Sequence, residues 1–194
     1  MKILLTGFEP FGGDAVNSSQ ETIKAVACSD FVGAEVFVEL LPVSFKRVGN
    51  MLVSLIDELG PDVVMMFGQA GTSENIRIER FALNLMDSTK GDNDGYIPNE
   101  ETIISDSPLA LQSTMPVKAM KEVLTECGIP TVVSNSAGLY VCNTTYYTAL
   151  HHIAAKALPT QAVFIHLPKI SEEWTAQKLK MAVTELIIHL NQIK

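Results

Sequence analysis

Cysteine and histidine are scarce in this sequence, which contains three cysteines and four histidines. Cys28, Cys127 and Cys142 are odd in number and lack disulfide or zinc spacing, which fits a protein of a reducing compartment. Neither an HExxH motif nor a CxxC pair is present, and standard zinc sites use such spacings. We therefore expect no metal, no other cofactor and no disulfide framework.

Basic residues and long apolar runs are also lacking. The chain has 14 Lys and Arg against 22 Asp and Glu, a net charge of -8 and a pI of about 4.9. Nucleic acids and anionic membranes bind basic surfaces, so we expect neither as a partner. No apolar run approaches the roughly 20 residues that span a bilayer. The run at residues 3–5 is too short for a signal peptide, so the sequence predicts a cytoplasmic protein that binds a small molecule or a peptide.

Strand-like and helix-like segments alternate along almost the whole chain. Short apolar runs predict strands, and apolar residues at helical spacing predict helices. Ser18 and Glu21 have capping-box spacing, so a helix is expected to begin at Ser18. Ser44 and Ser171 are further candidate caps, and Gly60 is a candidate helix stop. The expected strands are 2–6, 34–41, 62–67, 76–85, 129–134 and 162–167, and the expected helices are 18–28, 44–59, 114–127, 143–158 and one from 171.

This alternation predicts an α/β fold, a three-layer α/β/α sandwich around a mostly parallel twisted sheet. A length of 194 residues with 47% hydrophobic residues suits one domain over residues 1–194. In such folds the site lies at the carboxyl ends of the strands, which gathers the GFEPFGG loop (7–13), the GQAGTSEN loop (68–75), Cys142 and His166 at one edge. The irregular segment 87–108 is either a covering loop or an assembly arm.

Cys142 lies where the strand 129–134 leads into the helix 143–158. A thiol there meets the positive end of the helix dipole and unpaired backbone N–H groups, which favour the thiolate and can hold an oxyanion. This is the setting of a nucleophile. The ordinary alternative is a small buried apolar side chain, because unpaired cysteine is often buried.

A nucleophilic cysteine needs a nearby base, and few histidines are available. His151 and His152 lie two to three turns along the helix after Cys142, roughly 13 to 15 Å away from it. His189 lies on the last helix, where a solvated histidine is ordinary. His166 is unusual because it interrupts an apolar strand at the active edge, although a hydrogen-bonded core histidine is the alternative interpretation.

Glu79 is the candidate for the group that orients the base. It lies in a strand-like segment among apolar residues, and a buried carboxylate must find a partner. That partner is either a catalytic histidine or a neighbouring cation, Arg77 or Arg80. The sequence alone leaves both possibilities open.

Four separated blocks together resemble the pyrrolidone-carboxylate peptidase family, also called pyroglutamyl-peptidase I. The blocks are GFEPFGG at 7–13, ERFALN after and including Glu79, SNSAGLYVCNTTYY around Cys142, and VFIHLP around His166. The resemblance covers nearly the whole chain, in the order and spacing of the family. One departure is Ser18, which stands where the family more often has proline.

This resemblance implies a cysteine peptidase that removes N-terminal pyroglutamate through a thioester, with peptides bearing that residue as partners. It implies a cytosolic α/β/α sandwich that assembles as a homotetramer. By the same resemblance Cys142 is the nucleophile, His166 the general base and acid, and Glu79 the residue that orients the imidazole. The implied substrate-binding residues are Phe8, Phe11, Gln69, Tyr140 and Val141.

Two other classes of function remain open on the sequence. A nucleoside-phosphorylase-like enzyme would need an anion site near GFEPFGG, which lacks the lysine and serine of a phosphate-binding P-loop. A catalytically silent protein would retain pyroglutamyl peptides without cleaving them. Sensitivity to thiol alkylation and release of an amine from a pyroglutamyl amide separate these classes from the peptidase.

Overall fold

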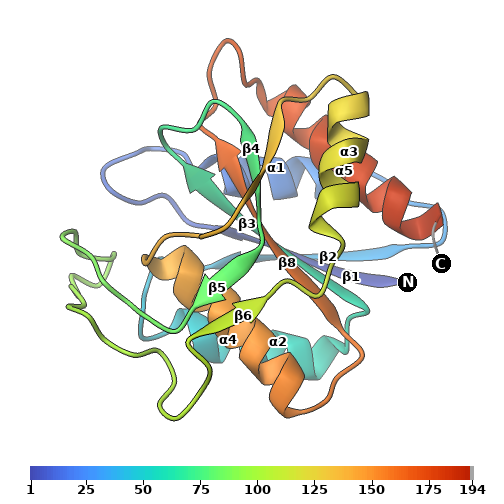
Figure 1. Ribbon diagram of the computed structural model, residues 1–194. Helices are drawn as coiled ribbons and strands as arrows, with labels where there is room; N and C mark the ends of the chain where they lie inside the picture. Colours follow the sequence, from blue (N-terminus) through green and yellow to red (C-terminus); the bar gives the residue numbers. More distant parts are fainter. Residues whose placement is uncertain (193–194) are drawn as a thin grey trace.

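A six-stranded sheet forms the centre of the computed structural model, which describes residues 1–192 (Figure 1). Neighbouring strands are parallel, except that β4 and β8 are antiparallel. β5 (Phe81–Leu83) and β6 (Ala110–Gln112) form a separate antiparallel pair. The order across the main sheet is β2 (Glu35–Leu41), β1 (Lys2–Phe8), β3 (Val63–Ala70), β8 (Gln161–Pro168), β4 (Ile76–Glu79) and β7 (Thr131–Ser134).

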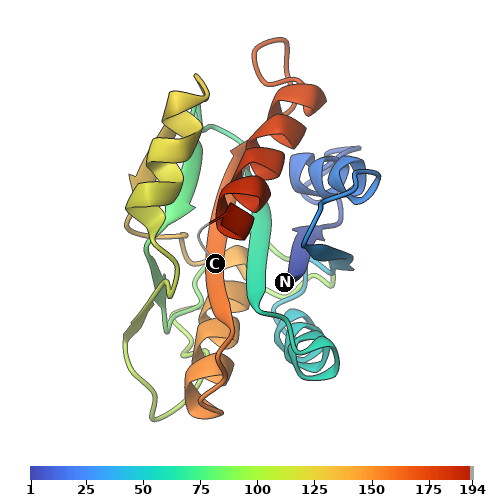
Figure 2. The ribbon, with the colours of Figure 1, turned by 90° about the vertical axis from the view of Figure 1, so that its right-hand side faces the viewer.

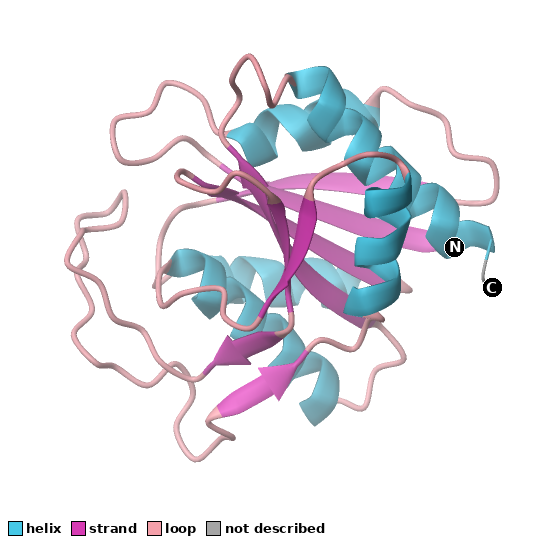
Figure 3. Ribbon diagram, turned by 45° about the horizontal axis from the view of Figure 1, so that its top comes forward, coloured by secondary structure: helices cyan, strands magenta, loops and turns pink. Residues whose placement is uncertain are grey.

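Helices cover both faces of the main sheet (Figure 3). One apolar cluster joins the sheet to α1 (Ser18–Ala27), α3 (Val117–Glu126) and α5 (Ala176–Gln192). The other cluster joins the opposite face to α2 (Val48–Leu59) and α4 (Val141–Ala155). Figure 2 shows the first group of helices in the upper half of the view and the second group in the lower half. The predicted three-layer α/β/α sandwich is thus confirmed.

Alternation along the central strands decides which side chains face α4. Val163 and Ile165 of β8 pack in the cluster with α1 and α5, whereas Phe164 packs in the cluster with α2 and α4. Because strand side chains alternate between faces, His166 points to the same side as Phe164. In β4, Ile78 belongs to the first cluster, so Glu79 faces the α4 side as well.

Two helices begin differently from the prediction. Asn17, not Ser18, caps α1: its Oδ1 accepts a hydrogen bond from the Ser19 N–H at 3.0 Å. The backbone of Asn17 is extended, as a cap requires, while Ser18 is already helical. The helix predicted from Ser44 begins at Val48, because Ser44 caps only the turn before it, accepting from the Arg47 N–H at 3.3 Å.

The later helices also begin away from their predicted starts. α3 begins at Val117 rather than at 114, and Pro116 is its N-cap. α4 begins at Val141, so Cys142 lies inside the first turn rather than before the helix. α5 begins at Ala176 instead of near Ser171, and the Thr175 hydroxyl accepts from the Lys178 N–H at 3.2 Å. The predicted stop at Gly60 is confirmed, since this residue adopts the left-handed conformation after α2.

The predicted strand 76–85 is wrong as a single element. It breaks at Arg80, so β4 joins the main sheet and β5 joins the smaller one, where it pairs with β6, a strand that was not expected. Much of segment 87–108 is irregular, held at its base by a bridge between Met86 and Glu101. No helix within residues 1–192 is both long and apolar enough to cross a bilayer.

Candidate active site

The structure brings Cys142, His166 and Glu79 together from three elements on the α4 side of the sheet. His166, near the end of β8, is 7% exposed, and Glu79, at the end of β4, is fully buried. The His166 Nδ1 and the Glu79 Oε1 are 2.9 Å apart. This bond occupies Nδ1 and leaves the other ring nitrogen for Cys142.

Gly68 provides the space for the sulfur of Cys142 between α4 and the sheet. It is the register partner of His166 on the neighbouring strand β3. A Cβ atom at position 68 would lie only 2.9 Å from the Cys142 Sγ and 2.9 Å from the Phe164 ring. The thiol therefore packs directly on the backbone of Gly68, one strand away from the imidazole. The GQAGTSEN loop was predicted to start at this glycine, but β3 continues to Ala70.

Gly68→Ala is expected to reduce activity more than stability. The new methyl group must displace either the Cys142 sulfur or the buried Phe164 ring, and overpacking costs about 1 to 3 kcal/mol. A nucleophile misplaced by about 1 Å costs on the order of 10²-fold in rate. The measurement is kcat/KM on the amide substrate that the sequence resemblance implies, together with the thermal midpoint. Gly49→Ala on α2 is the control. Its new Cβ would lie 3.2 Å from the Thr148 side chain, six residues after Cys142 on α4, and this variant should keep its activity.

Both partners of His166 favour its protonated form. Burial alone lowers the pKa of the imidazole, but the hydrogen bonds to Cys142 and Glu79 and the charges of these groups outweigh it. Together they raise the pKa of His166 from 6.5 to about 9. At neutral pH the ring therefore holds a proton between a sulfur and a carboxylate.

Glu79 has both of the partners that the sequence offered as alternatives. Its Oε1 contacts the His166 ring and also lies 3.5 Å from the Nε of Arg77. Arg80 turns away and bonds to Asn135 at 3.0 Å. The Oε2 of Glu79 has no hydrogen-bond partner among the described residues. The nearby Arg77 and the protonated imidazole compensate the buried charge, which would otherwise be costly.

Two backbone N–H groups beside the sulfur are available. The Tyr140 carbonyl accepts hydrogen bonds from the N–H groups of Asn143 at 2.9 Å and Thr144 at 3.2 Å. By contrast, the N–H groups of Val141 and Cys142 donate no hydrogen bond within residues 1–192. The free donors thus lie one and two residues before the predicted helix start at 143. Their position at the positive end of α4 suits a developing negative charge.

A small pocket opens next to the sulfur, and all five predicted substrate-binding residues line it. Phe8 packs on Phe164, with ring centroids 6.4 Å apart, and Phe11 packs on Tyr140 at 6.1 Å. The complete lining is Phe8, Phe11, Asn17, Val43, Gln69, Tyr140, Val141 and Cys142. Asn17 and Val43 were missed by the sequence analysis. Val43 follows β2, so the rule on carboxyl ends of strands was the available signal, whereas nothing singled out Asn17 as a lining residue.

Gln69 is held in one orientation by its surroundings. Its Oε1 accepts from the backbone N–H of Ser18 at 2.9 Å, and its Nε2 donates to Asp14 at 3.0 Å. Asp14 in turn pairs with Lys169 at 2.7 Å, and the hydrogen bond from Lys169 lowers the pKa of its carboxyl. A proline at position 18 would lack the N–H that fixes Gln69. Ser18 thus makes part of the pocket wall rigid in this chain.

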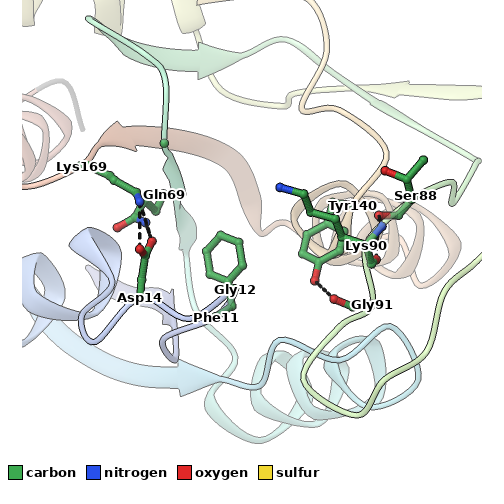
Figure 4. A pocket seen from close by; sticks show the side chains of 11 residues that line it. Phe11, Gly12, Asp14, Gln69, Ser88, Lys90, Gly91, Tyr140 and Lys169 are labelled. Carbon is green, nitrogen blue, oxygen red and sulfur yellow. Dashed lines mark hydrogen bonds and ion pairs between the residues drawn. The ribbon is translucent and has the colours of Figure 1, made fainter.

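A larger pocket of about 460 Å³ adjoins the small one (Figure 4). The two share Phe11, Gln69 and Tyr140 in their walls. The start of segment 87–108 forms the far side of the larger pocket, where the Tyr140 hydroxyl donates to the Gly91 carbonyl at 2.9 Å. This part of the segment therefore borders the site.

The remaining histidines lie away from Cys142. His151 contacts the Ser107 hydroxyl at 3.0 Å, and His152 contacts Asp57 at 2.8 Å. Across residues 1–192 no group of three or more His, Cys, Asp or Glu is arranged to hold a metal ion. The residues gathered at this site supply a thiol, an imidazole, a carboxylate and backbone N–H groups.

Related sequences cover most of the chain. The family model described as pyroglutamyl peptidase matches residues 1–191. A pyrrolidone-carboxylate peptidase of Thermococcus onnurineus is 49% identical over 173 residues, which are 89% of this chain and 86% of that relative. One from Vibrio vulnificus is 38% identical over 188 residues, 97% of this chain and 88% of that relative.

Solved structures agree with the sequence comparison. The pyrrolidone carboxyl peptidase from Fervidobacterium islandicum AW-1 has a TM-score of 0.94 at 35% identity, with 99% of each chain covered. That from Pyrococcus furiosus has a TM-score of 0.94 at 36% identity, with 100% of each chain covered. The family match, the two relatives and the two structures lead to one conclusion: this chain belongs to the pyroglutamyl peptidase family.

Proposed function

We propose that this protein is a cysteine peptidase that removes an N-terminal pyroglutamyl residue from peptides, with Cys142, His166 and Glu79 as its catalytic residues. Membership of the pyroglutamyl peptidase family supports the reaction. The observation that carries the assignment of residues is the chain of contacts from Cys142 through His166 to the buried Glu79. This is the constellation of nucleophile, base and orienting group that acyl transfer requires.

The mechanism follows from the proton on His166. The Cys142 sulfur, having given its proton to the imidazole, attacks the carbonyl carbon of the pyroglutamyl residue. The free N–H groups of Val141 and Cys142 stabilise the oxyanion that forms. His166 then gives its proton to the departing amine, which leaves a thioester. The ring next takes a proton from water as the water attacks, and pyroglutamate is released with the thiol restored.

The small pocket explains the choice of pyroglutamate over an ordinary first residue. The pocket has only about 10 Å³ of free space, so its walls move apart to admit the ring. Its aromatic residues Phe8, Phe11 and Tyr140 then pack on the flat lactam, and Gln69 supplies a fixed polar group. An unblocked N-terminus carries an ammonium that this pocket would have to strip of water. The pocket thus excludes unblocked peptides by their cost of desolvation.

One assay tests the function against its alternatives. The chain is expected to release a chromogenic amine from a pyroglutamyl amide and to lose this activity after iodoacetamide treatment. A silent binding protein would retain pyroglutamyl peptides without releasing amine, and a phosphorylase would be insensitive to alkylation. The family comparisons do not favour either alternative.

We further propose that the chain assembles as a homotetramer in the cytoplasm. Half-buried apolar side chains on the sheet-edge strand β2 and the 94% exposed Val32 nearby support assembly. Three free cysteines support a reducing compartment. Sedimentation equilibrium tests the first statement, where a monomer at micromolar concentration would contradict it. Cell fractionation tests the second, where recovery in a membrane or secreted fraction would contradict it.

A further inference from the structure

The larger pocket lies where a substrate must continue past the scissile bond. When the lactam ring occupies the small pocket, the scissile carbonyl lies at the Cys142 sulfur. The peptide beyond the scissile bond then extends out of the small pocket. The larger pocket shares three walls with it and is open to solvent. The residue that follows pyroglutamate therefore enters the larger pocket.

The larger pocket differs in charge from the chain as a whole, whose net charge is -8. Three charged side chains line it, Asp14, Lys90 and Lys169. Asp14 and Lys169 neutralise each other through two contacts of 2.7 and 3.0 Å. Lys90 remains, and within residues 1–192 its ammonium group makes no hydrogen bond or ion pair. The pocket thus has one uncompensated positive charge.

The backbone of Lys90 is also held in place at the pocket. The Ser88 hydroxyl accepts from the Lys90 N–H at 3.0 Å and donates to the Lys90 carbonyl at 2.8 Å. The next residue, Gly91, is tied to Tyr140 beside the nucleophile. In Figure 4 the Lys90 side chain extends past Tyr140 toward the middle of the pocket. Its charge is therefore directed at the space that the leaving peptide occupies.

We propose that the larger pocket is the subsite for the residue after pyroglutamate, and that Lys90 makes it prefer a carboxylate there. The inference rests on the proposed function. The carboxylate comes either from an acidic side chain at that position or from the free carboxyl end of a two-residue substrate. Because Lys90 is exposed, the gain in kcat/KM is about two- to fivefold at low salt, and salt screens it.

The test compares matched substrates that differ in one charge. One pair is pGlu-Glu-amide and pGlu-Gln-amide, and the other is pGlu-Ala with a free carboxylate and pGlu-Ala-amide. The readout is the ratio of kcat/KM within each pair, which cancels general losses of activity. The wild-type ratio is expected to exceed 1 in at least one pair. Lys90→Gln should bring that ratio to about 1, and Lys90→Glu should invert it.

Lys118→Gln is the matched control, since it removes the same charge from the exposed surface of α3 and should leave the ratios as in the wild type. A preference in either pair that Lys90→Gln abolishes supports the inference and identifies which carboxylate is bound. Equal rates within both pairs, or a preference that Lys90→Gln retains, overturn it. Cleavage of pGlu-Gln-amide by the wild type tests the proposed function separately, and its absence would overturn both.

Discussion

Replacing Cys142 with Ser or Ala is expected to lower kcat/KM on a pyroglutamyl amide by at least about 10⁴-fold, the scale seen when a nucleophile is removed from a catalytic unit. A serine hydroxyl in the same place keeps the shape of the side chain but is a far weaker nucleophile than a thiolate. Alanine removes the reacting atom altogether. Either change is small and lies at the wall of a pocket, so the fold should persist.

The measurement is steady-state hydrolysis together with circular dichroism, which shows that the variants are folded. Cys28→Ser and Cys127→Ser make the same chemical change at the two exposed thiols and should retain full activity. If Cys142→Ala kept more than a few per cent of the wild-type turnover, Cys142 would have no place in the mechanism.

Glu79→Gln is expected to lower kcat by about 10² to 10⁴-fold, as when the orienting carboxylate of a catalytic triad is replaced by an amide. The glutamine can fill the same space, but it brings no charge to stabilise the imidazolium. Its amide can also hold the ring in the wrong tautomer. Glu122→Gln, on the exposed surface of α3, is the matched control and should leave kcat unchanged.

The pH profile distinguishes this role from a structural one. Burial lowers the pKa of His166, but Cys142 and Glu79 raise it to about 9. Below that pH the ring holds the proton that the leaving amine needs, and above it the proton is lost. The wild-type kcat/KM should therefore fall on the alkaline side, with a midpoint near 9.

Removal of the Glu79 charge takes away part of what raises the pKa of His166, so the alkaline midpoint should move to lower pH in Glu79→Gln. A merely destabilised variant would lose activity without moving that midpoint. An unchanged alkaline limb in an otherwise folded Glu79→Gln protein would argue against the proposed role of Glu79.

Much of the architecture could be predicted because its signals are local. Continuous apolar runs mark strands buried on both faces, such as β3, and Gly60 marks a helix end. Helix starts were less reliable because several Ser, Thr and Asn residues compete for each cap. Asn17 caps α1 instead of Ser18, and the Thr175 hydroxyl accepts a hydrogen bond at the start of α5 instead of Ser171. Which residue caps a helix depends on backbone geometry and neighbouring contacts.

The site was predicted in part from the small number of histidines and in part from the resemblance to a known family. Few histidines can serve Cys142, and His166 is the one that interrupts an apolar strand. The partner of Glu79 could not be decided from the sequence, since Arg77 and Arg80 both lie within two residues of it. Packing resolved this by bringing both His166 and Arg77 to the same carboxylate oxygen.

The sequence by itself determined the alternation of elements, and with it the sandwich, because hydrophobic periodicity is a property of short segments. Only the tertiary structure decided the strand directions. β4 and β7 run opposite to the other four strands, so the rule that placed the two loops, Cys142 and His166 at one set of strand ends holds for β1, β3 and β8 but not for Cys142, which follows β7. Glu79 reaches the site through antiparallel pairing of β4 with β8, and Cys142 reaches it through the first turn of α4 over Gly68. Strand direction and helix placement depend on contacts between distant segments, and periodicity along the chain carries no information about them.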